Sequence, residues 1–267
     1  MRLQRFYISN KMTGLVGDKI GAQKEFSIDS SELVNQIHRV FRLEDGDSVI
    51  LFDGSGYDYE CKILAGDSKS ERAKDSKKTI DNKDRITFQV ISSVRSRFMP
   101  MRDIYLCAAI TKKDTFEWIV EKATELGVNH IVPVLAERSE KKSLNNKRLY
   151  KIAIEASEQS GRGNVPAILP ITTLEDVVGL VKSLDNTKAI VLHTEGDLLD
   201  RGGITLSDGI SGEIQPIYVF IGPEGGWSLV EMNLFHDSEI PIKCLGNQVL
   251  RAETAVVAAL SMVVFSK

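Results

Sequence analysis

The chain has 267 residues, and its 34 lysines and arginines against 37 aspartates and glutamates give a net charge of -3. Overall charge therefore does not indicate a nucleic-acid partner, and any anionic partner must bind a local basic patch. The 42% of hydrophobic residues is typical of a globular chain, which is long enough here for two domains. No apolar run approaches the roughly 20 residues of a membrane helix, and the first residues hold no apolar signal segment. We expect a soluble, cytoplasmic protein.

The first part of the chain contains short segments of strand character and one helix. Alternating apolar residues predict strands near residues 5–8, 48–52 and 57–64, with a turn at 53–56 that joins the last two as a hairpin. Ser31 opens a helix whose apolar stripe recurs at helical spacing. These features predict a small β-barrel with one helix.

The positive charge is concentrated in residues 62–102, which contain 11 basic and 5 acidic residues. Its polar centre, residues 66–85, is typical of a loop or hairpin tip, and a strand follows at 86–94. The rhythm of the chain changes near Pro100. We assign a first domain to residues 1–72 and a second to 73–267, with the boundary between 66 and 102.

After the boundary, strands and helices alternate. Apolar strand-like runs at 104–110, 130–135, 189–193 and 217–221 are separated by helical patterns, of which the first begins near Asp114 with Glu117 as a capping partner. This alternation predicts an α/β fold with a largely parallel sheet and helices on both faces.

The segment 217–231, IYVFIGPEGGWSLVE, is the strongest candidate for a ligand site. A continuous apolar run predicts a central strand, which ends in Gly222, Pro223, Glu224, Gly225 and Gly226. Ligands bind beyond the carboxyl ends of parallel strands, where glycines allow close approach of the backbone. Ser228 and Glu231 then form a capping box for the next helix. A plain turn that needs glycine is the alternative interpretation.

The last segment, 244–265, places polar groups at the start of a helix that is apolar nearly all round. Arg251, Glu253 and Thr254 lie where free N–H groups and the helix dipole favour an acceptor, although Glu253 and Thr254 are equally suited to capping. A helix without a polar face is buried in a core or in a subunit interface. His193, which follows the strand at 189–192, is a further candidate for the same cleft.

Several common sites have no support in the sequence. There is no GxGxxG, GxxxxGK[ST], HExxH or GxSxG motif. The three cysteines and four histidines are too scattered for a disulfide framework or a metal site, and we assign no metal.

Five colinear motifs resemble one family. They are KATELGV at 122–128, PVLAERSEKK at 133–142, EASEQSGRGNVP at 155–166, IGPEGG at 221–226 and LGNQVLRAETA at 245–255. With RFYI at 5–8 and HRVFRLEDGD at 38–47, they are similar to the RsmE-type family of SPOUT methyltransferases. The resemblance implies a parallel sheet with a C-terminal trefoil knot, preceded by a PUA-like RNA-binding barrel. It also implies methylation of uridine N3 in small-subunit ribosomal RNA with S-adenosylmethionine.

The resemblance further implies which residues act. The cofactor would lie against Leu192, His193, Gly222, Pro223, Gly225, Gly226, Leu245, Gly246, Val249, Leu250, Thr254 and Ala255. Arg251 would stabilise charge on the uracil carbonyls, with Glu224 or Glu253 as proton acceptor. Asn247 and Gln248 replace the pair that is more usual in the family at these positions. A ribose 2'-O-methyltransferase and a non-catalytic RNA-binding assembly factor remain alternatives.

Two expectations concern partners. RNA, as ribosomal RNA or as the assembled small subunit, would contact a set of arginines: Arg5, Arg39, Arg42, Arg95, Arg97, Arg102, Arg138 and Arg162. The apolar final helix would form part of a homodimer interface, with a buried helix in a monomer as the alternative.

Overall fold

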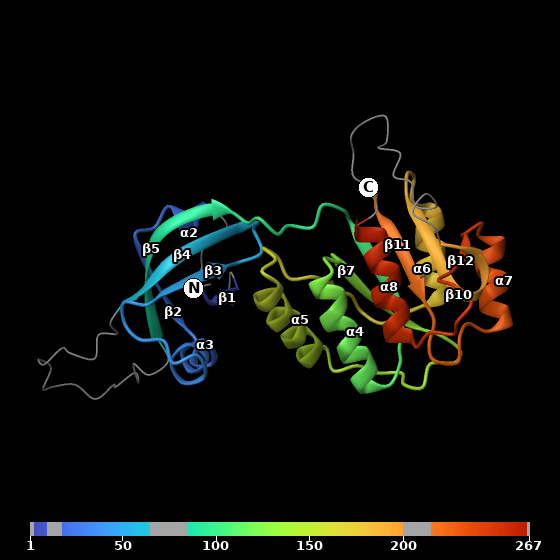
Figure 1. Cartoon of the computed structure of the whole chain (residues 1–267), viewed down its shortest axis with the longest axis horizontal. Helices are drawn as coiled ribbons and strands as arrows, with labels where there is room; N and C mark the ends of the chain where they lie inside the picture. Colours follow the sequence, from blue (N-terminus) through green and yellow to red (C-terminus); the bar gives the residue numbers. More distant parts are fainter. Residues whose placement is uncertain (1–2, 10–17, 65–84, 200–214, 266–267) are drawn as a thin grey trace, which may run out of the picture. The chain divides into compact units, whose positions relative to one another are not determined.

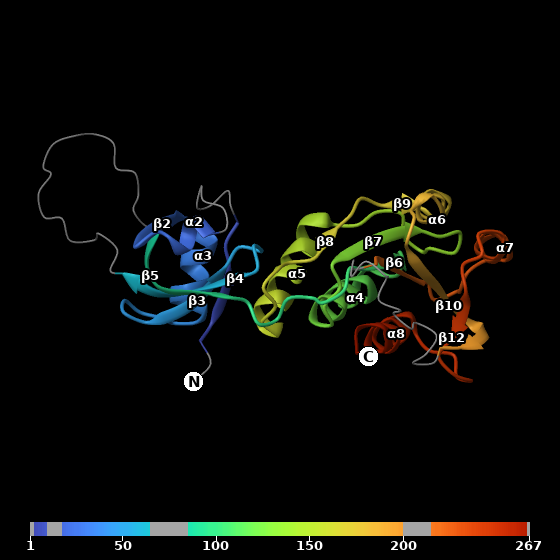
Figure 2. The same cartoon turned by 90° about the horizontal axis from the view of Figure 1, so that it is seen from above.

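The computed structural model describes residues 3–9, 18–64, 85–199 and 215–265, which form two compact units (Figures 1 and 2). Met1–Met99 and Gly161–Asn164 make up the first unit, and the second contains Pro100–Ser160 and Val165–Lys267. The division between Met99 and Pro100 lies within the expected boundary range of 66–102, beyond residue 72, because the strand at 85–95 belongs to the first unit. The expected loop at 66–85 lies almost wholly outside the described residues.

The first unit is a curled five-stranded sheet with the order β1-β3-β4-β5-β2. Its strands are β1 (Arg5–Tyr7), β2 (Glu25–Asp29), β3 (Ser48–Phe52), β4 (Tyr57–Leu64) and β5 (Arg85–Arg95). The expected hairpin is confirmed, since β3 and β4 pair antiparallel, and Gly54 and Gly56 adopt the positive φ of +86° and +87° that their turn requires. The helices are α2 (Asp18–Gly21) and α3 (Ser31–Asn35), which continues into a π-helical turn, Gln36–Val40.

Arg5 is a structural residue of the first unit. It is 8% exposed, and its guanidinium donates to both carboxylate oxygens of Asp58 at 2.7 and 2.9 Å. It also donates to the backbone carbonyl of Arg162 at 3.2 Å, which fixes the segment 161–164 on the barrel. Gly163 fits closely in this segment, because a Cβ there would lie 2.4 Å from the Ser96 side chain. Both terminal nitrogens of the Arg5 guanidinium are thus bonded inside the fold, which favours a structural role, and its expected contact with RNA stays a prediction.

The second unit has a seven-stranded sheet with the order β12-β10-β11-β6-β7-β8 and with β9 also paired to β7, and all these pairings are parallel. The strands are β6 (Ile104–Ala109), β7 (His130–Leu135), β8 (Ala167–Ile168), β9 (Thr172–Thr173), β10 (Lys188–Leu198), β11 (Ile217–Ile221) and β12 (Ile242–Cys244). The predicted α/β class and the central position of the strand at 217–221 are confirmed. All five side chains of β11 are buried.

Helices cover both faces of this sheet: α4 (Lys113–Glu125), α5 (Asn146–Ser160), α6 (Leu174–Ser183), α7 (Leu229–Asp237) and α8 (Ala252–Phe265). Figure 2 shows α4 and α8 on one side and α6 on the other. Phe116, Leu149 and Val256 belong to one core and Val178 and Phe235 to the other. None of the described helices is long and apolar enough to cross a membrane.

Two capping predictions have different outcomes. Ser228 and Glu231 form the expected capping box at the start of α7. The prediction of a capping box from Asp114 and Glu117 is wrong, because α4 starts after Lys112 without a side-chain cap. Glu117 instead accepts a hydrogen bond from Arg148 at 2.6 Å.

Replacing Arg5 with methionine should destabilise the first unit by about 3 kcal/mol, because Asp58 would remain partly buried without its partner. Burial raises the pKa of the Cys61 thiol to about 12, so this thiol reacts only when the barrel opens. The urea dependence of Cys61 labelling, read by mass spectrometry, measures the change. The exposed Arg39→Met is the control and should stay within about 0.5 kcal/mol of the parent. Equal midpoints for both variants would contradict the structural role of Arg5.

Candidate active site

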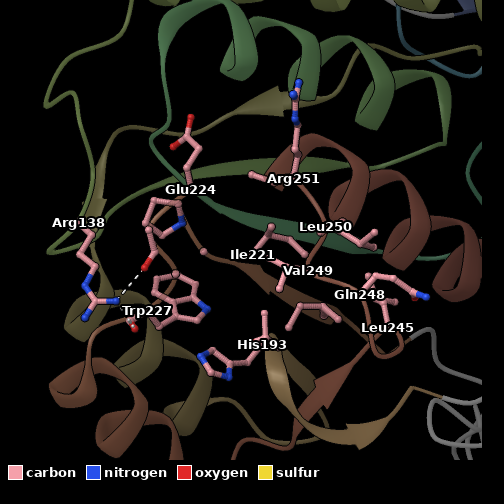
Figure 3. A pocket seen from close by; sticks show the side chains of 18 of the residues that line it. Arg138, His193, Ile221, Glu224, Trp227, Leu245, Gln248, Val249, Leu250 and Arg251 are labelled. Carbon is pink, nitrogen blue, oxygen red and sulfur yellow. Dashed lines mark hydrogen bonds between the residues drawn. The ribbon is translucent and has the colours of Figure 1, made fainter.

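A pocket of about 530 Å³ lies at the carboxyl ends of β11 and β12 and beside the part of β10 where its pairing with β11 stops (Figure 3). Three segments supply most of its lining: Leu192–Thr194 in β10, Ile221–Trp227 at the end of β11 and after it, and residues 245–252 from the end of β12 to the start of α8, without Asn247. Arg138 and Ala255 complete the lining. The register between β10 and β12 shifts after Leu192, so that His193 and Thr194 are not paired with β12. The volume is within the usual range of small-molecule sites, roughly 300–1,000 Å³.

The expected cofactor residues come together with one exception. Leu192, His193, Gly222, Pro223, Gly225, Gly226, Leu245, Gly246, Val249, Leu250 and Ala255 all line the pocket. Thr254 does not, because Arg251, Ala252 and Ala255 share the face of α8 and its connector that borders the pocket. Gln248, one of the two departures from the family pattern, lines the pocket, whereas Asn247 does not.

The glycines of the pocket have different reasons for being glycine. Gly226 and Gly246 have φ of +68° and +137°, which side chains disfavour. At Gly222 a Cβ would lie 3.2 Å from the indole nitrogen of Trp227. At Gly225 a Cβ would have ordinary contacts with Arg138, at 3.4 Å or more. Neither the backbone dihedral nor the surrounding fold therefore excludes a side chain at Gly225, and the constraint within the fold lies at Gly222, Gly226 and Gly246.

Trp227 was not among the residues expected in the site. It is 3% exposed, packs edge-on against Phe235 with ring centroids 5.1 Å apart, and lines the pocket beside Gly222. Its indole N–H is buried and has no hydrogen-bond partner within the described ranges. Buried donors are nearly always satisfied, so this N–H marks a place for an acceptor on a ligand or a water. The signal in the sequence was its position directly after the glycine loop.

Two charged residues lie at the rim. Figure 3 shows Glu224 and Arg251 on the same side of the pocket, away from His193. One Glu224 oxygen accepts a hydrogen bond from the backbone N–H of Lys112 at 3.4 Å, and Arg251 is exposed. Glu253 lies outside the lining residues, so of the two candidate proton acceptors only Glu224 borders the pocket.

Arg138 and Glu231 hold the loop after β11. The Arg138 guanidinium donates to the carbonyl oxygens of Gly225 at 2.8 Å and of Trp227 at 3.3 Å. Glu231 is buried and accepts from the N–H of Ser228 at 2.7 Å and from that of Glu137 at 2.8 Å. The turn after β7 is thus joined to the pocket loop from both sides. The role of Arg138 that the structure supports is to position this loop.

The other arginines expected to bind RNA fall into two groups. Arg39, Arg42, Arg95 and Arg97 are exposed in the first unit. Arg162 is buried against Asn164, and burial lowers the pKa of its guanidinium to about 10. Arg102 donates to the Val263 carbonyl in the second unit. Arg162 and Arg5 are therefore buried rather than part of an exposed basic surface, and the expected contact of the exposed arginines with RNA stays a prediction. Among the described residues, no group of three or more His, Cys, Asp or Glu is arranged to hold a metal.

Comparison with known proteins identifies the class. The RNA methyltransferase domain family matches residues 99–264, and the RNA methyltransferase PUA domain matches residues 37–75. The chain belongs to the RNA methyltransferase family, with a parallel-sheet domain of SPOUT type and an N-terminal PUA-like barrel.

Relatives and solved structures match along nearly the whole chain. "Ribosomal RNA small subunit methyltransferase E" of Bacillus subtilis is 28% identical, covering 98% of this chain and 96% of the relative. The protein of the same name from Rickettsia conorii is 26% identical with the same coverage. A putative methyltransferase of Legionella pneumophila, solved with bound cofactor SAM, has a TM-score of 0.75 at 25% identity and covers 98% of this chain and 97% of its own.

Replacing Glu231 with alanine should destabilise the second unit by about 2 kcal/mol, because it leaves two backbone N–H groups without their charged acceptor. Glu231→Gln keeps one acceptor and should lose about half as much. Denaturant unfolding followed by tryptophan fluorescence measures both. Asp237→Ala, at an exposed position of the same helix, is the control. Equal stability of the Glu231 and Asp237 variants would show that the loop does not depend on this carboxylate.

Proposed function

We propose that the chain transfers a methyl group from S-adenosylmethionine to N3 of a uridine in small-subunit ribosomal RNA. The observation that carries the proposal is the pocket in which two of the family motifs, at 221–226 and 245–255, meet residues 192–194, within a chain that belongs to the RNA methyltransferase family. The names of the relatives from Bacillus subtilis and Rickettsia conorii support the ribosomal substrate. A ribosomal substrate in turn supports a cytoplasmic location.

The residues of the pocket fit S-adenosylmethionine. Leu192, Ile221 and Val249 offer apolar surface for an adenine ring, and the glycine loop exposes backbone groups to ribose hydroxyls. The unpaired indole N–H of Trp227 offers a donor to the same ligand. The cofactor of the Legionella pneumophila structure supports this assignment. When bound, the cofactor supplies a methyl group on a positively charged sulfur.

Arg251 and Glu224 are the residues proposed to act on the uracil. The N3 imide is a weak nucleophile until its proton leaves, and the resulting charge spreads onto the two carbonyl oxygens. The cation of Arg251 at the rim stabilises that charge. The carboxylate of Glu224, at the same rim, accepts the N3 proton as the nitrogen bonds to the methyl carbon and the carbon–sulfur bond breaks. The uridine must leave its base stack to reach this rim.

Nucleoside analysis tests the proposal. RNA methylated with labelled S-adenosylmethionine and digested to nucleosides should contain labelled 3-methyluridine. A label on ribose would instead show a 2'-O-methyltransferase, and absence of transfer to naked RNA and to assembled subunits would favour a non-catalytic factor.

The Arg251→Gln variant separates chemistry from binding. It should lower kcat by about 100-fold, as loss of a charge-stabilising donor does. Cofactor affinity should be unchanged, because Arg251 lies at the rim. Quenching of Trp227 fluorescence by the cofactor measures that affinity. The other tryptophan, Trp118, lies on α4 outside the pocket, and its replacement by phenylalanine leaves the Trp227 signal intact.

We also propose that the active species is a homodimer. Much of the apolar surface of α8 is used inside the second unit, where Val256, Ala259 and Val263 are buried. Other large apolar side chains lie at the surface, with Val249 at 81% and Phe265 at 69% exposure. Surface of this kind favours coverage by a second copy of the chain.

Light scattering at micromolar concentration should give twice the 29.6 kDa mass of the chain. Phe265→Glu should shift the mass toward a single chain while cofactor binding, measured in parallel, reports that the pocket is still folded. An active protein with the mass of one chain would overturn the dimer.

A further inference from the structure

Another pocket of the second unit is lined by lysines. It has a volume of about 810 Å³, and we call it the lysine pocket. Its charged lining consists of Lys113 at the start of α4, Lys141 and Lys142 in the loop after β7, Lys147 at the start of α5, and Glu117. Ser143, Asn145 and Asn146 add polar groups. Lysines from α4, from the loop after β7 and from α5 thus line the same pocket.

The single carboxylate of the lining does not neutralise these lysines. Glu117 accepts a hydrogen bond from Arg148 at 2.6 Å, and this bond holds the pKa of Glu117 below its usual value. Lys113 lies 3.9 Å from the same carboxylate. The charge of Lys141 also lowers the pKa of Glu117, but among the described residues none of Lys141, Lys142 and Lys147 lies within ion-pair distance of a carboxylate. The net charge of the lining is therefore positive and open to an external anion.

The walls of the lysine pocket are fixed. Arg148 on α5 is joined to Glu117 on α4, and these helices pack side by side (Figure 1). Lys112 pairs with Glu140 at 3.5 Å, which ties the loop to the start of α4. Asn145 caps α5 by accepting from the N–H of Arg148, so the positive end of the helix dipole also faces this region.

The lysine pocket is connected to the candidate active site by short stretches of chain. The loop after β7 that carries Lys141 and Lys142 also carries Arg138, which donates to the Gly225 carbonyl. Lys112, the neighbour of Lys113, donates its backbone N–H to Glu224 at the rim of the active site. The loop after β7 therefore contributes Arg138 to the active-site pocket and Lys141 and Lys142 to the lysine pocket.

We infer that the lysine pocket binds the phosphate backbone of the RNA strand next to the nucleotide that enters the active site. The inference rests on the proposed function. A flipped nucleotide loses its stacking energy, and contacts of lysines with neighbouring phosphates offset that cost without reading sequence. Lysine suits this role because its ammonium acts as a mobile point charge. The volume and the spread of amines over three segments fit several consecutive phosphates rather than one isolated anion.

The test is the salt dependence of RNA binding by Lys141→Gln/Lys142→Gln/Lys147→Gln, with a short fluorescein-labelled oligouridylate as probe. The slope of log affinity against log salt should flatten by about 0.7 for each phosphate that a lysine no longer neutralises, or about 2 for three phosphates. With small-subunit ribosomal RNA, KM should rise while kcat at saturating RNA stays unchanged. The single variant Lys142→Gln is measured as well. Its control is Lys182→Gln, which removes an exposed lysine of α6 outside the lysine pocket.

The outcomes separate this inference from the proposed function. If the parent methylates RNA and the triple variant keeps its salt slope and KM, the lysine pocket does not bind RNA and the inference fails alone. If the parent neither binds RNA nor transfers methyl groups, the proposed function fails. Cofactor affinity of the triple variant, from Trp227 fluorescence, should equal that of the parent. A loss of cofactor binding would mean that the lysines support the fold, and would also overturn the inference.

Discussion

The hydrogen bonds of Arg138 and Glu231 to the backbone around residues 225–228 are the constraint on which the pocket depends. A loop rich in glycine has little intrinsic preference for one conformation, and ordering it costs conformational entropy. Here two carbonyl oxygens accept from one guanidinium, and one buried carboxylate accepts from two backbone N–H groups. The loop is thereby held before any ligand arrives, which lowers the cost of binding.

Much of the fold follows from local patterns in the sequence. The apolar run at 217–221 predicted a central strand, because only a strand covered on both faces can be apolar throughout. The capping box of Ser228 and Glu231 is a contact over three residues and was predicted for that reason. The similar pattern at Asp114 failed because a distant residue, Arg148, competes for Glu117. Local rules fail where a long-range partner offers a stronger interaction.

The same limit explains what was missed in the site. Arg5 and Arg162 look like surface cations in the sequence, and contacts between residues far apart in the chain bury them, with Asp58 and the segment 161–164 against Arg5. Trp227 looks like an ordinary core residue, and only the fold places its N–H beside Gly222 without a partner among the described residues. The lysine pocket brings together residues from 113 to 147, which no single motif marks. In contrast, the resemblance to the family implied the cofactor segments, and two of them also follow the ends of strands β11 and β12.

Hydrogen exchange with and without S-adenosylmethionine tests the central claim most directly, because it reports every backbone segment that the cofactor orders. The account predicts added protection in peptides that cover residues 192–194, 221–227 and 245–252, with peptides of the barrel and of the lysine pocket unchanged. Protection confined to another part of the chain, or no protection at a saturating concentration of the cofactor, would contradict the assignment of this pocket as the active site.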